Sequence, residues 1–400
     1  MPSFIGSIPT IDDSDMDFVD EIENKKIEIS GNKEIVENKI KDIVGSDSLF
    51  FFNRGREAIY VALQALGISQ GNEVLVQSMT CSAVVTPVLC LGAKPIYVDI
   101  SKDTFNIDIE DLKKKISPKT KALIVQHTFG KFAEMEKIQK ICKANDIKII
   151  EDCAHLFRGD IKDTVVGKFS DLSIFSFAQD KAISSVTGGL LVVNNTEYAE
   201  KVKAIYGACS NPTERESKYP LSYLKLWNFA KKYYFTPLLP FQKRITIGKV
   251  AIMMSRWAGI TKQQASEQIE NDIVPTKMGD IQYALLEMQL NKLDELNRHR
   301  QDILRVYDEK SNDLLLRYPI LVEDPGLVLS LLSQNRYLCG RWYNSIVFPI
   351  KNPEPVKYIQ GSCPTAEYVV RHIINLPLDI DITKSDAINI KGIVSKFLIH

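Results

Sequence analysis

The alternation of short apolar runs with helical stretches between residues 50 and 195 constrains the fold most strongly. Runs that are apolar throughout are typical of strands covered on both faces, and intervening helices indicate crossovers in a largely parallel sheet. The predicted strands are 49–52, 73–77, 95–99, 122–127, 147–151, 172–177 and 190–193. The chain is therefore predicted to be an α/β protein with a mostly parallel, seven-stranded sheet.

Beyond the seventh strand the sequence predicts mainly helices. Apolar residues at helical spacing predict one long helix over 279–307. Thr383 is a candidate N-cap for the last helix, because its hydroxyl can accept a hydrogen bond from the first helical turn. The other predicted elements are a strand over 318–322 and helices over 326–332, 365–373 and 385–397.

The length of 400 residues favours two domains. We predict a large domain over residues 30–275 and a small C-terminal α/β domain over 276–400, with residues 1–29 packed near the small domain. Residues 210–275 mix aromatic and basic side chains without the αβ rhythm, and we expect them to be an insertion.

Two roles for the 210–275 insertion are open. We favour one in which it packs on a partner subunit or covers the active site. The alternative is peripheral contact with a membrane surface, because basic and aromatic side chains on one amphipathic stretch suit the lipid interface. Trp227 and Phe235 are the side chains on which that alternative would depend.

Charge and cysteine content narrow the class of protein. Fifty basic residues balance fifty acidic residues, so the long-range field behind non-specific nucleic-acid binding is missing, and we predict no nucleic-acid partner. Seven cysteines without a CxxC pair indicate neither a disulfide framework nor a zinc site. We predict no metal, a structural role for His127, and a cytoplasmic location, since no leader-like or membrane-spanning segment is evident.

Polar residues follow three of the predicted strands, at the sheet edge where parallel sheets bind ligands. Gly55 opens a helix after the first strand, and a helix N-terminus suits a phosphate. Asp152 follows the fifth strand, and Lys181 lies shortly after the sixth. A buried lysine can form a Schiff base, and an aspartate can keep a pyridine nitrogen protonated. Together these residues predict a pyridoxal phosphate site.

The order and spacing of these residues resemble those of the DegT/DnrJ/EryC1/StrS family of sugar aminotransferases, which are pyridoxal phosphate enzymes of fold type I. The resemblance covers nearly the whole chain. The matching segments include GREAI at 55–59, GNEV at 71–74, LGAKP at 91–95, QHTFG at 126–130, IEDCAH at 150–155, FSF at 175–177, DIQYA at 280–284 and NLPL at 375–378. The resemblance implies a large cofactor-binding domain and a smaller C-terminal α/β domain.

The resemblance also implies roles for individual residues. Lys181 matches the Schiff-base lysine, and Asp152 matches the aspartate that pairs with the pyridinium nitrogen. His155 occupies the position of a Gln or His near the ring hydroxyl. Ser176 and the amides of Gly55 and Arg56 match the phosphate cradle.

This chain departs from the family at several of these positions. Arg54-Gly55-Arg56 replaces the usual Ser-Gly-Thr, so a guanidinium could take the place of a hydroxyl at the phosphate. Cys81 stands where many members stack an aromatic ring on the cofactor. The alternative is that Cys81 is a buried cysteine with a purely structural role. The family's asparagine from the neighbouring subunit falls near Pro275, and Lys277 is a candidate substitute.

The implied activity is transfer of an amino group from an amino acid, with glutamate favoured, to a keto-sugar carried on a nucleotide. A homodimer with shared active sites is also implied. One alternative is a sugar dehydratase that uses the pyridoxamine form and replaces the lysine with histidine, and Lys181 argues against it. The other is a non-catalytic binding or regulatory protein with this fold, against which the presence of both Lys181 and Asp152 argues.

Overall fold

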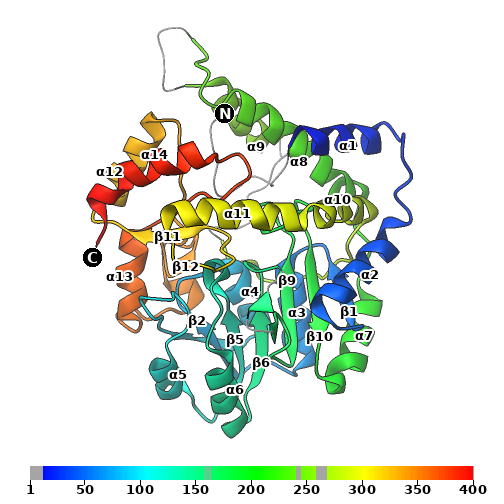
Figure 1. Ribbon diagram of the computed structural model, residues 1–400. Coiled ribbons are helices and arrows are strands. Elements are labelled where there is room, and N and C mark those ends of the chain that lie inside the picture. Colours follow the sequence, from blue (N-terminus) through cyan, green and yellow to red (C-terminus); the bar gives the residue numbers. More distant parts are fainter. Residues whose placement is uncertain (1–11, 158–159, 162–163, 240–244, 258–267, 400) are drawn as a thin grey trace.

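The computed structural model describes residues 12–157, 160–161, 164–239, 245–257 and 268–399, and shows helices on both faces of a central sheet (Figure 1). The sheet has seven strands in the order β1-β10-β9-β6-β5-β2-β4. These strands are β1 (Leu49–Phe52), β2 (Glu73–Gln77), β4 (Lys94–Val98), β5 (Thr120–Gln126), β6 (Lys148–Asp152), β9 (Leu172–Ser176) and β10 (Gly189–Val193). Neighbours from β4 to β9 are parallel, whereas β10 is antiparallel to both β9 and β1. All seven predicted strands are confirmed.

Successive side chains of a strand point to opposite faces, and both faces of this sheet are covered. In β2, Val74 and Val76 belong to the core under α3 (Gly55–Ala65) and α4 (Ser82–Cys90). Leu75, between them, packs instead under α5 (Ile109–Lys115) and α6 (Met135–Ala144). The strand is therefore apolar at consecutive positions because neither face meets water.

The prediction of one helix over 279–307 is wrong. The chain forms α10 (Asp280–Asn291) and α11 (Leu293–Tyr307), and the backbone at Lys292 leaves the helical region at φ −99° and ψ 0°. The amine of Lys292 forms an ion pair with Asp15, which lies in α1 (Asp13–Glu23), at 2.6 Å. The break lets α10 pack toward the sheet and the N-terminal helices while α11 continues into the C-terminal core.

After α11, the described residues contain a two-stranded antiparallel sheet and three α-helices. Strand β11 (Tyr318–Leu321) is antiparallel to β13 (Ile373–Leu376). The helices are α12 (Pro325–Gln334), α13 (Pro364–His372) and α14 (Lys384–Val394). The predicted strand and helices are confirmed, and so is the cap at Thr383, whose hydroxyl accepts a hydrogen bond from the amide of Asp386 at 3.1 Å. The domain boundaries remain a prediction.

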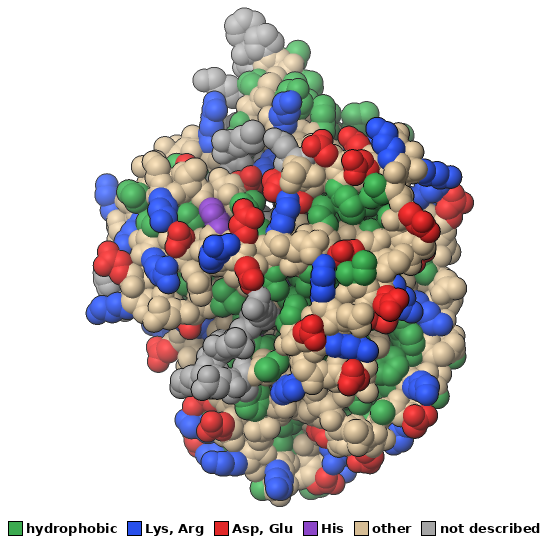
Figure 2. Space-filling view, turned by 45° about the vertical axis from the view of Figure 1, so that its right-hand side comes forward, with side chains coloured by type: hydrophobic (Ala, Val, Ile, Leu, Met, Phe, Trp, Pro, Cys, Tyr) green, Lys and Arg blue, Asp and Glu red, His purple; other side chains and the backbone are tan. Residues whose placement is uncertain are grey.

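The predicted insertion contains two helices in its described part, α8 (Glu214–Lys232) and α9 (Ile247–Trp257). The apolar face of α8 packs against α1 and α10. Trp227 is buried there, so it is not available to a membrane, contrary to the expectation for that alternative. Helix α9 extends beyond the rest of the molecule, at the top of Figures 1 and 2. No helix in the described parts of the chain is both long and apolar enough to span a bilayer.

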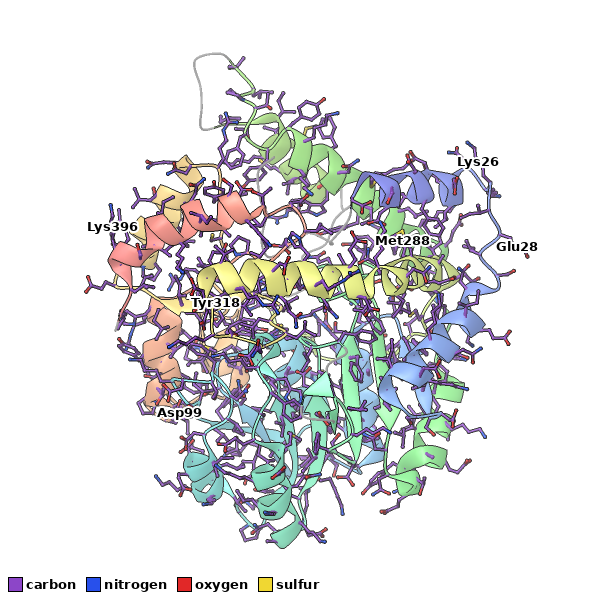
Figure 3. All side chains as sticks on the ribbon, viewed as in Figure 1. Lys26, Glu28, Asp99, Met288, Tyr318 and Lys396 are labelled. Carbon is purple, nitrogen blue, oxygen red and sulfur yellow. The ribbon has the colours of Figure 1, made fainter. Side chains whose placement is uncertain are left out.

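The sheet and the C-terminal part are joined by specific hydrogen bonds. Asp99, which is labelled in Figure 3, follows β4 and lies near the start of α13. Its two carboxylate oxygens accept hydrogen bonds from the amides of Thr365 at 2.9 Å and Ala366 at 2.8 Å. These bonds satisfy amides in the first turn of α13 and hold the helix against the sheet.

The remaining α-helices are α2 (Asn32–Val44) and α7 (Ala199–Ala208), which pack on opposite faces of the sheet's β1 edge.

Candidate active site

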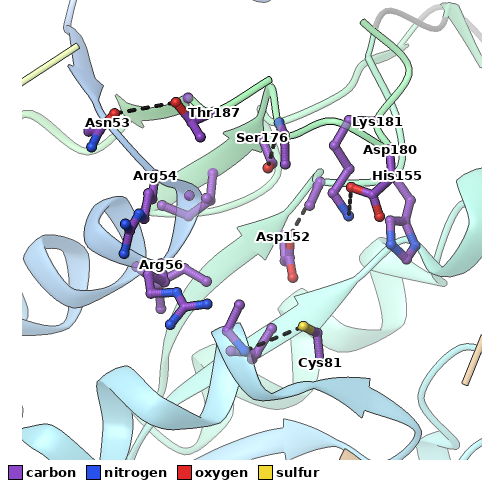
Figure 4. Close-up of a pocket in the computed structure, with 18 of the residues that line it drawn as sticks. Asn53, Arg54, Arg56, Cys81, Asp152, His155, Ser176, Asp180, Lys181 and Thr187 are labelled. Atoms are coloured by element: carbon purple, nitrogen blue, oxygen red, sulfur yellow. Dashed lines mark hydrogen bonds and ion pairs between the residues drawn. The ribbon is translucent and has the colours of Figure 1, made fainter. Parts of the chain in front are cut away.

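A cavity of about 620 Å³ lies at the carboxyl ends of β6 and β9 and at the turn between β1 and α3 (Figure 4). Strand ends and helix starts meet there because the parallel strands all run toward this edge. The cavity is lined by every predicted site residue, namely Gly55, Arg56, Cys81, Asp152, His155, Ser176 and Lys181. The fold therefore brings together residues that lie up to 126 positions apart in the sequence.

Asp152 is the last residue of β6 and is almost completely buried. Its Oδ1 accepts a hydrogen bond from the amide of Ala154 at 3.0 Å, the one hydrogen bond to this carboxylate found among the described residues. Burial raises the pKa of Asp152, while the charges of Lys181 and His127 oppose that rise. A buried carboxylate of this kind gains from a cationic N–H donor in the cavity, which a protonated pyridine nitrogen provides.

Lys181 lies in the turn that follows β9, and its side chain is 13% exposed. The amine is 4.0 Å from Asp180 Oδ1 and 5.8 Å from the ring centroid of Trp342. Figure 4 shows the Lys181 side chain directed into the cavity on the same side as Asp152. A lysine amine held in a largely water-excluded cavity beside an acid is suited to covalent amine chemistry.

The start of α3 forms another part of the cavity wall. No side chain caps this helix, and Gly55 is its first residue. A Cβ added to Gly55 would lie 3.3 Å from Ser176 Oγ, tighter than most Cβ contacts, so glycine lets the helix start lie close to that hydroxyl. An uncapped helix N-terminus beside a serine hydroxyl can bind a phosphate through amide and hydroxyl donors.

Two predicted cofactor ligands have protein partners as well. Arg56 Nη1 donates a hydrogen bond to Glu270 Oε1 at 2.7 Å, and this ion pair competes with the predicted phosphate contact. Cys81 Sγ accepts a hydrogen bond from the amide of Ala83 at 3.4 Å and so caps α4. Burial raises the pKa of the Cys81 thiol. The structural role considered for Cys81 is thus present, while its contact with a cofactor remains a prediction.

His155 is buried, and both of its ring nitrogens have hydrogen-bond partners. The amide of Phe129 donates to Nδ1 at 3.2 Å, which places the imidazole proton on Nε2, 3.1 Å from the hydroxyl of Tyr343. Burial, together with the charges of Lys181 and Arg317, lowers the pKa of His155 well below its usual range. The imidazole is therefore neutral and can donate one hydrogen bond.

Sequence reasoning did not identify a second set of lining residues. Trp342, Tyr343 and Phe348 come from the C-terminal part, where β12 (Val347–Phe348) pairs in parallel with β3 (Thr80–Cys81). Helix α8 contributes five more residues: Arg215, Glu216, Lys218, Tyr219 and Ser222. The aromatic cluster at 342–348 was a visible signal, and the α8 residues bear out the expectation that the insertion covers this cavity.

One buried group in the described residues has metal-ligand chemistry, formed by His127, Glu151 and Cys153. Its carboxylate already has protein partners. Glu151 Oε1 accepts from His127 Nε2 at 2.8 Å and from the amide of Gly167 at 2.9 Å, and Oε2 accepts from the amide of Phe169 at 3.1 Å. These bonds give the group a structural role and agree with the expectation for His127.

The fold and the cavity define a class, the pyridoxal-phosphate-dependent aminotransferases of fold type I. Residues 9–224 match the DegT/DnrJ/EryC1/StrS aminotransferase family, and the chain belongs to this family. The buried acid, the enclosed amine and the uncapped helix start fit pyridoxal phosphate, the cofactor of this class.

Two sequence relatives show how far the similarity extends along the chain. The chain is 27% identical over 368 residues to the uncharacterized protein MJ1066 of Methanocaldococcus jannaschii, covering 90% of this chain and 89% of that protein. It is 38% identical over 157 residues to a GDP-perosamine synthase of Escherichia coli O157:H7, a match that covers only 39% of this chain and 41% of the synthase.

Among solved structures, a putative sugar aminotransferase of Streptococcus pneumoniae in its PMP form superposes with a TM-score of 0.72 at 17% identity, covering 99% of this chain and 98% of that one. PseC of Helicobacter pylori, an aminotransferase involved in pseudoaminic acid biosynthesis, also gives a TM-score of 0.72, at 22% identity and 98% coverage of both chains. At these identities the similarity establishes the shared fold.

Proposed function

We propose that this protein transfers the amino group of an amino acid, glutamate in the first instance, to a keto-sugar linked to a nucleotide. The observation that carries the proposal is the arrangement of Lys181, Asp152 and the start of α3 around one cavity. This arrangement provides an amine, a buried acid and a phosphate site within a single enclosed space.

Pyridoxal phosphate, when bound, supplies an aldehyde that accepts the amino group and a conjugated ring that delocalises the electrons of a broken C–H bond. The amides of Gly55 and Arg56 and the hydroxyl of Ser176 would hold its phosphate. Asp152 would hold a positive charge on the ring nitrogen through its carboxylate.

The residues of this chain perform the proton transfers. Lys181 is the residue that would hold the cofactor, and its free amine would take the proton from the α-carbon of the donor and give it back on the other side of the donor nitrogen, to the former aldehyde carbon. His155 remains neutral and donates from Nε2, so its position is set by Phe129 on one side and Tyr343 on the other. The aromatic wall of Trp342 and Tyr343 limits access of water to the amine.

The proposed acceptor is supported by charge in the outer part of the cavity. Arg54, Arg215 and Lys218 line it, and cationic side chains there suit a diphosphate. Tyr219 offers an aromatic surface beside them. The names of two relatives, a GDP-perosamine synthase and a dTDP-amino-sugar transaminase of Aneurinibacillus thermoaerophilus, also support a nucleotide-linked sugar.

A homodimer with shared active sites and a cytoplasmic location complete the proposal. Family membership supports the dimer, and light scattering after gel filtration tests it. All seven cysteines are free thiols in the structure, which fits a reducing compartment.

The test is an absorbance spectrum of the purified protein with pyridoxal phosphate. The wild type should show a visible band that Lys181→Ala lacks and that the surface control Lys113→Ala retains. Glutamate should convert this band to the shorter-wavelength absorbance of pyridoxamine phosphate. A visible band that glutamate leaves unchanged would show that glutamate is not the amino donor. Absence of a band in the wild type would overturn catalysis in favour of the non-catalytic alternative.

A further inference from the structure

Residues 217–266, which span most of α8 and all of α9, have an unusual charge distribution, of which the proposed function uses Lys218 alone. Residues 217–266 contain nine basic residues and no acidic residue, although the whole chain has fifty of each. The nine are Lys218, Lys225, Lys231, Lys232, Lys243, Arg244, Lys249, Arg256 and Lys262. Lys218, Lys225 and Lys231 form ion pairs with acids outside the segment, namely Glu214, Asp20 with Glu23, and Asp381. The other six basic residues lie in a segment without acidic residues, and such a segment in a neutral protein creates a local positive field that attracts anionic surfaces.

Exposed apolar side chains accompany these charges on α9. Trp257 is 91% exposed, Met253 63% and Met254 60%. Lys249, Met253, Arg256 and Trp257 are spaced four, three and one residues apart, so they fall on one side of the helix. Small or buried residues face the other way: a Cβ on Gly248 would lie 2.4 Å from the carbonyl of Ala230 in α8.

The connection between α8 and α9 extends this exposed apolar surface. Leu238 and Leu239 are 49% and 55% exposed, and Ile245 precedes α9 at 41%. We call Leu238, Leu239, Met253, Met254 and Trp257, with Lys249 and Arg256, the α9 surface. Figure 1 shows α9 projecting from the body of the molecule, and Figure 2 shows hydrophobic and basic side chains among those at the top of the molecule.

We propose that the α9 surface docks this enzyme on a lipid bilayer that contains anionic headgroups. Apolar side chains enter the interface while lysine and arginine contact lipid phosphates, which is how amphipathic helices bind membranes. Methionine, leucine and tryptophan adapt to an acyl boundary, and tryptophan favours the headgroup region.

The charge pattern also argues against the main competing occupant, a second copy of the same surface. A two-fold contact would place one α9 surface against another. Residues 217–266 offer no carboxylate to pair with the opposing lysines and arginines, so like charges would face each other. An anionic bilayer supplies the missing negative charge.

Docking through the α9 surface would fix the distance between the cavity and the bilayer, because α8 connects the two. Helix α8 carries Tyr219 of the cavity wall near its N-terminus and leads to the α9 surface at its C-terminal end. The thirteen residue steps from Tyr219 to Lys232 correspond to roughly 20 Å of helix. The docked enzyme would therefore hold its cavity near the bilayer but outside it.

The experiment is flotation of the full-length enzyme with vesicles. The vesicles contain phosphatidylcholine alone or phosphatidylcholine with phosphatidylglycerol, at low and at high salt. The wild type should float with the anionic vesicles, less so at high salt, and should not float with neutral ones. Acrylamide quenching gives a second measurement, because Trp257 is exposed whereas Trp227 and Trp342 are buried. Anionic vesicles should protect Trp257 from the quencher.

Two variants test the two parts of the α9 surface. Met253→Ser with Met254→Ser and Trp257→Ser should reduce vesicle partitioning at least tenfold. Lys249→Gln with Arg256→Gln should reduce it by about fivefold for each cation removed. Exposed residues elsewhere provide the matched controls, Ile359→Ser with Ile388→Ser and Lys113→Gln with Lys114→Gln, which should bind like the wild type.

Each other outcome would overturn the proposal. One contrary result is wild-type protein that stays in the bottom fraction with anionic vesicles at low salt, and a second is flotation of the α9 variants to the same extent as the wild type. A third contrary result is protection of Trp257 in the wild type without lipid that increases with protein concentration; this would assign the surface to contacts between copies. None of these readouts requires transaminase activity, so the result is independent of the proposed function.

Discussion

The cavity has two walls of different origin. The sheet-edge wall consists of Gly55, Asp152, Ser176 and Lys181, which lie at or just after strand ends. The outer wall consists of the first two turns of α8 and residues 342–348, which reach the cavity from distant parts of the chain. Under the proposed function, the first wall would supply the reacting groups and the second would enclose the substrate.

The difference between the walls lies in what holds each residue. In the sheet-edge wall, the backbone ladder of the sheet fixes the strand ends, so the side chains have little freedom. The outer wall depends on helix packing, since α8 is held by apolar contacts with α1 and α10. Such a wall can change in sequence without disturbing the sheet, as expected of a region that sets specificity.

Asp152→Asn tests the sheet-edge wall and has the largest expected effect. The amide keeps the hydrogen bond from Ala154 but cannot stabilise a positive charge, so both half-reactions should slow by about 10²- to 10³-fold. Stopped-flow spectra with the amino donor and with the acceptor measure the two rates separately. A loss confined to the acceptor step would contradict the assignment of Asp152 to the shared chemistry.

Glu57→Gln tests the helix start behind the sheet-edge wall, because Glu57 is a buried acid in the first turn of α3. Burial raises the pKa of Glu57 to about 7, although its carboxylate accepts a hydrogen bond from the amide of Thr276 at 3.1 Å. Because the pKa is raised in the folded state, Glu57 contributes its full stability below pH 4.5, and this is lost as the pH rises through about 7. The wild type should lose about 3 kcal/mol over that window relative to the variant. Parallel urea titrations at pH 4.5 and 8 would show no such difference if Glu57 were unshifted.

Arg215→Gln tests the outer wall. Loss of a charged donor to a diphosphate should raise KM for the acceptor by about 10- to 100-fold and leave the donor half-reaction unchanged. Steady-state kinetics with a nucleotide-linked keto-sugar gives KM, and the spectral change with glutamate gives the donor rate. Equal loss in both half-reactions would remove the functional distinction between the walls.

Thr383→Ala lies outside both walls and has the smallest expected effect. Loss of the hydroxyl that caps α14 should lower the free energy of unfolding by about 1 kcal/mol. Both half-reactions should keep their wild-type rates, as measured in the same assays. Thr383→Ser, which retains the hydroxyl, is the control and should be as stable as the wild type within a few tenths of a kcal/mol.

The sequence predicted most of the fold because strands buried on both faces leave a local signature. Seven apolar runs matched the seven strands of the large sheet, and Thr383 was recognisable as a cap from its position before the last helix. The helix over 279–307 was predicted as continuous because periodicity reports which residues are apolar. Hydrophobic periodicity does not predict the ion pair between Lys292 and Asp15, or the break in the helix at Lys292.

The sequence by itself determined the sheet, the family and the sheet-edge wall, since parallel strands bring residues at their carboxyl ends to one place wherever the chain continues afterwards. Tertiary structure alone decided the outer wall, the Arg56–Glu270 ion pair and the burial of Trp227. These features depend on how segments far apart in the chain pack against one another. A side chain's contacts across such a distance follow from the fold as a whole, so local spacing does not encode them.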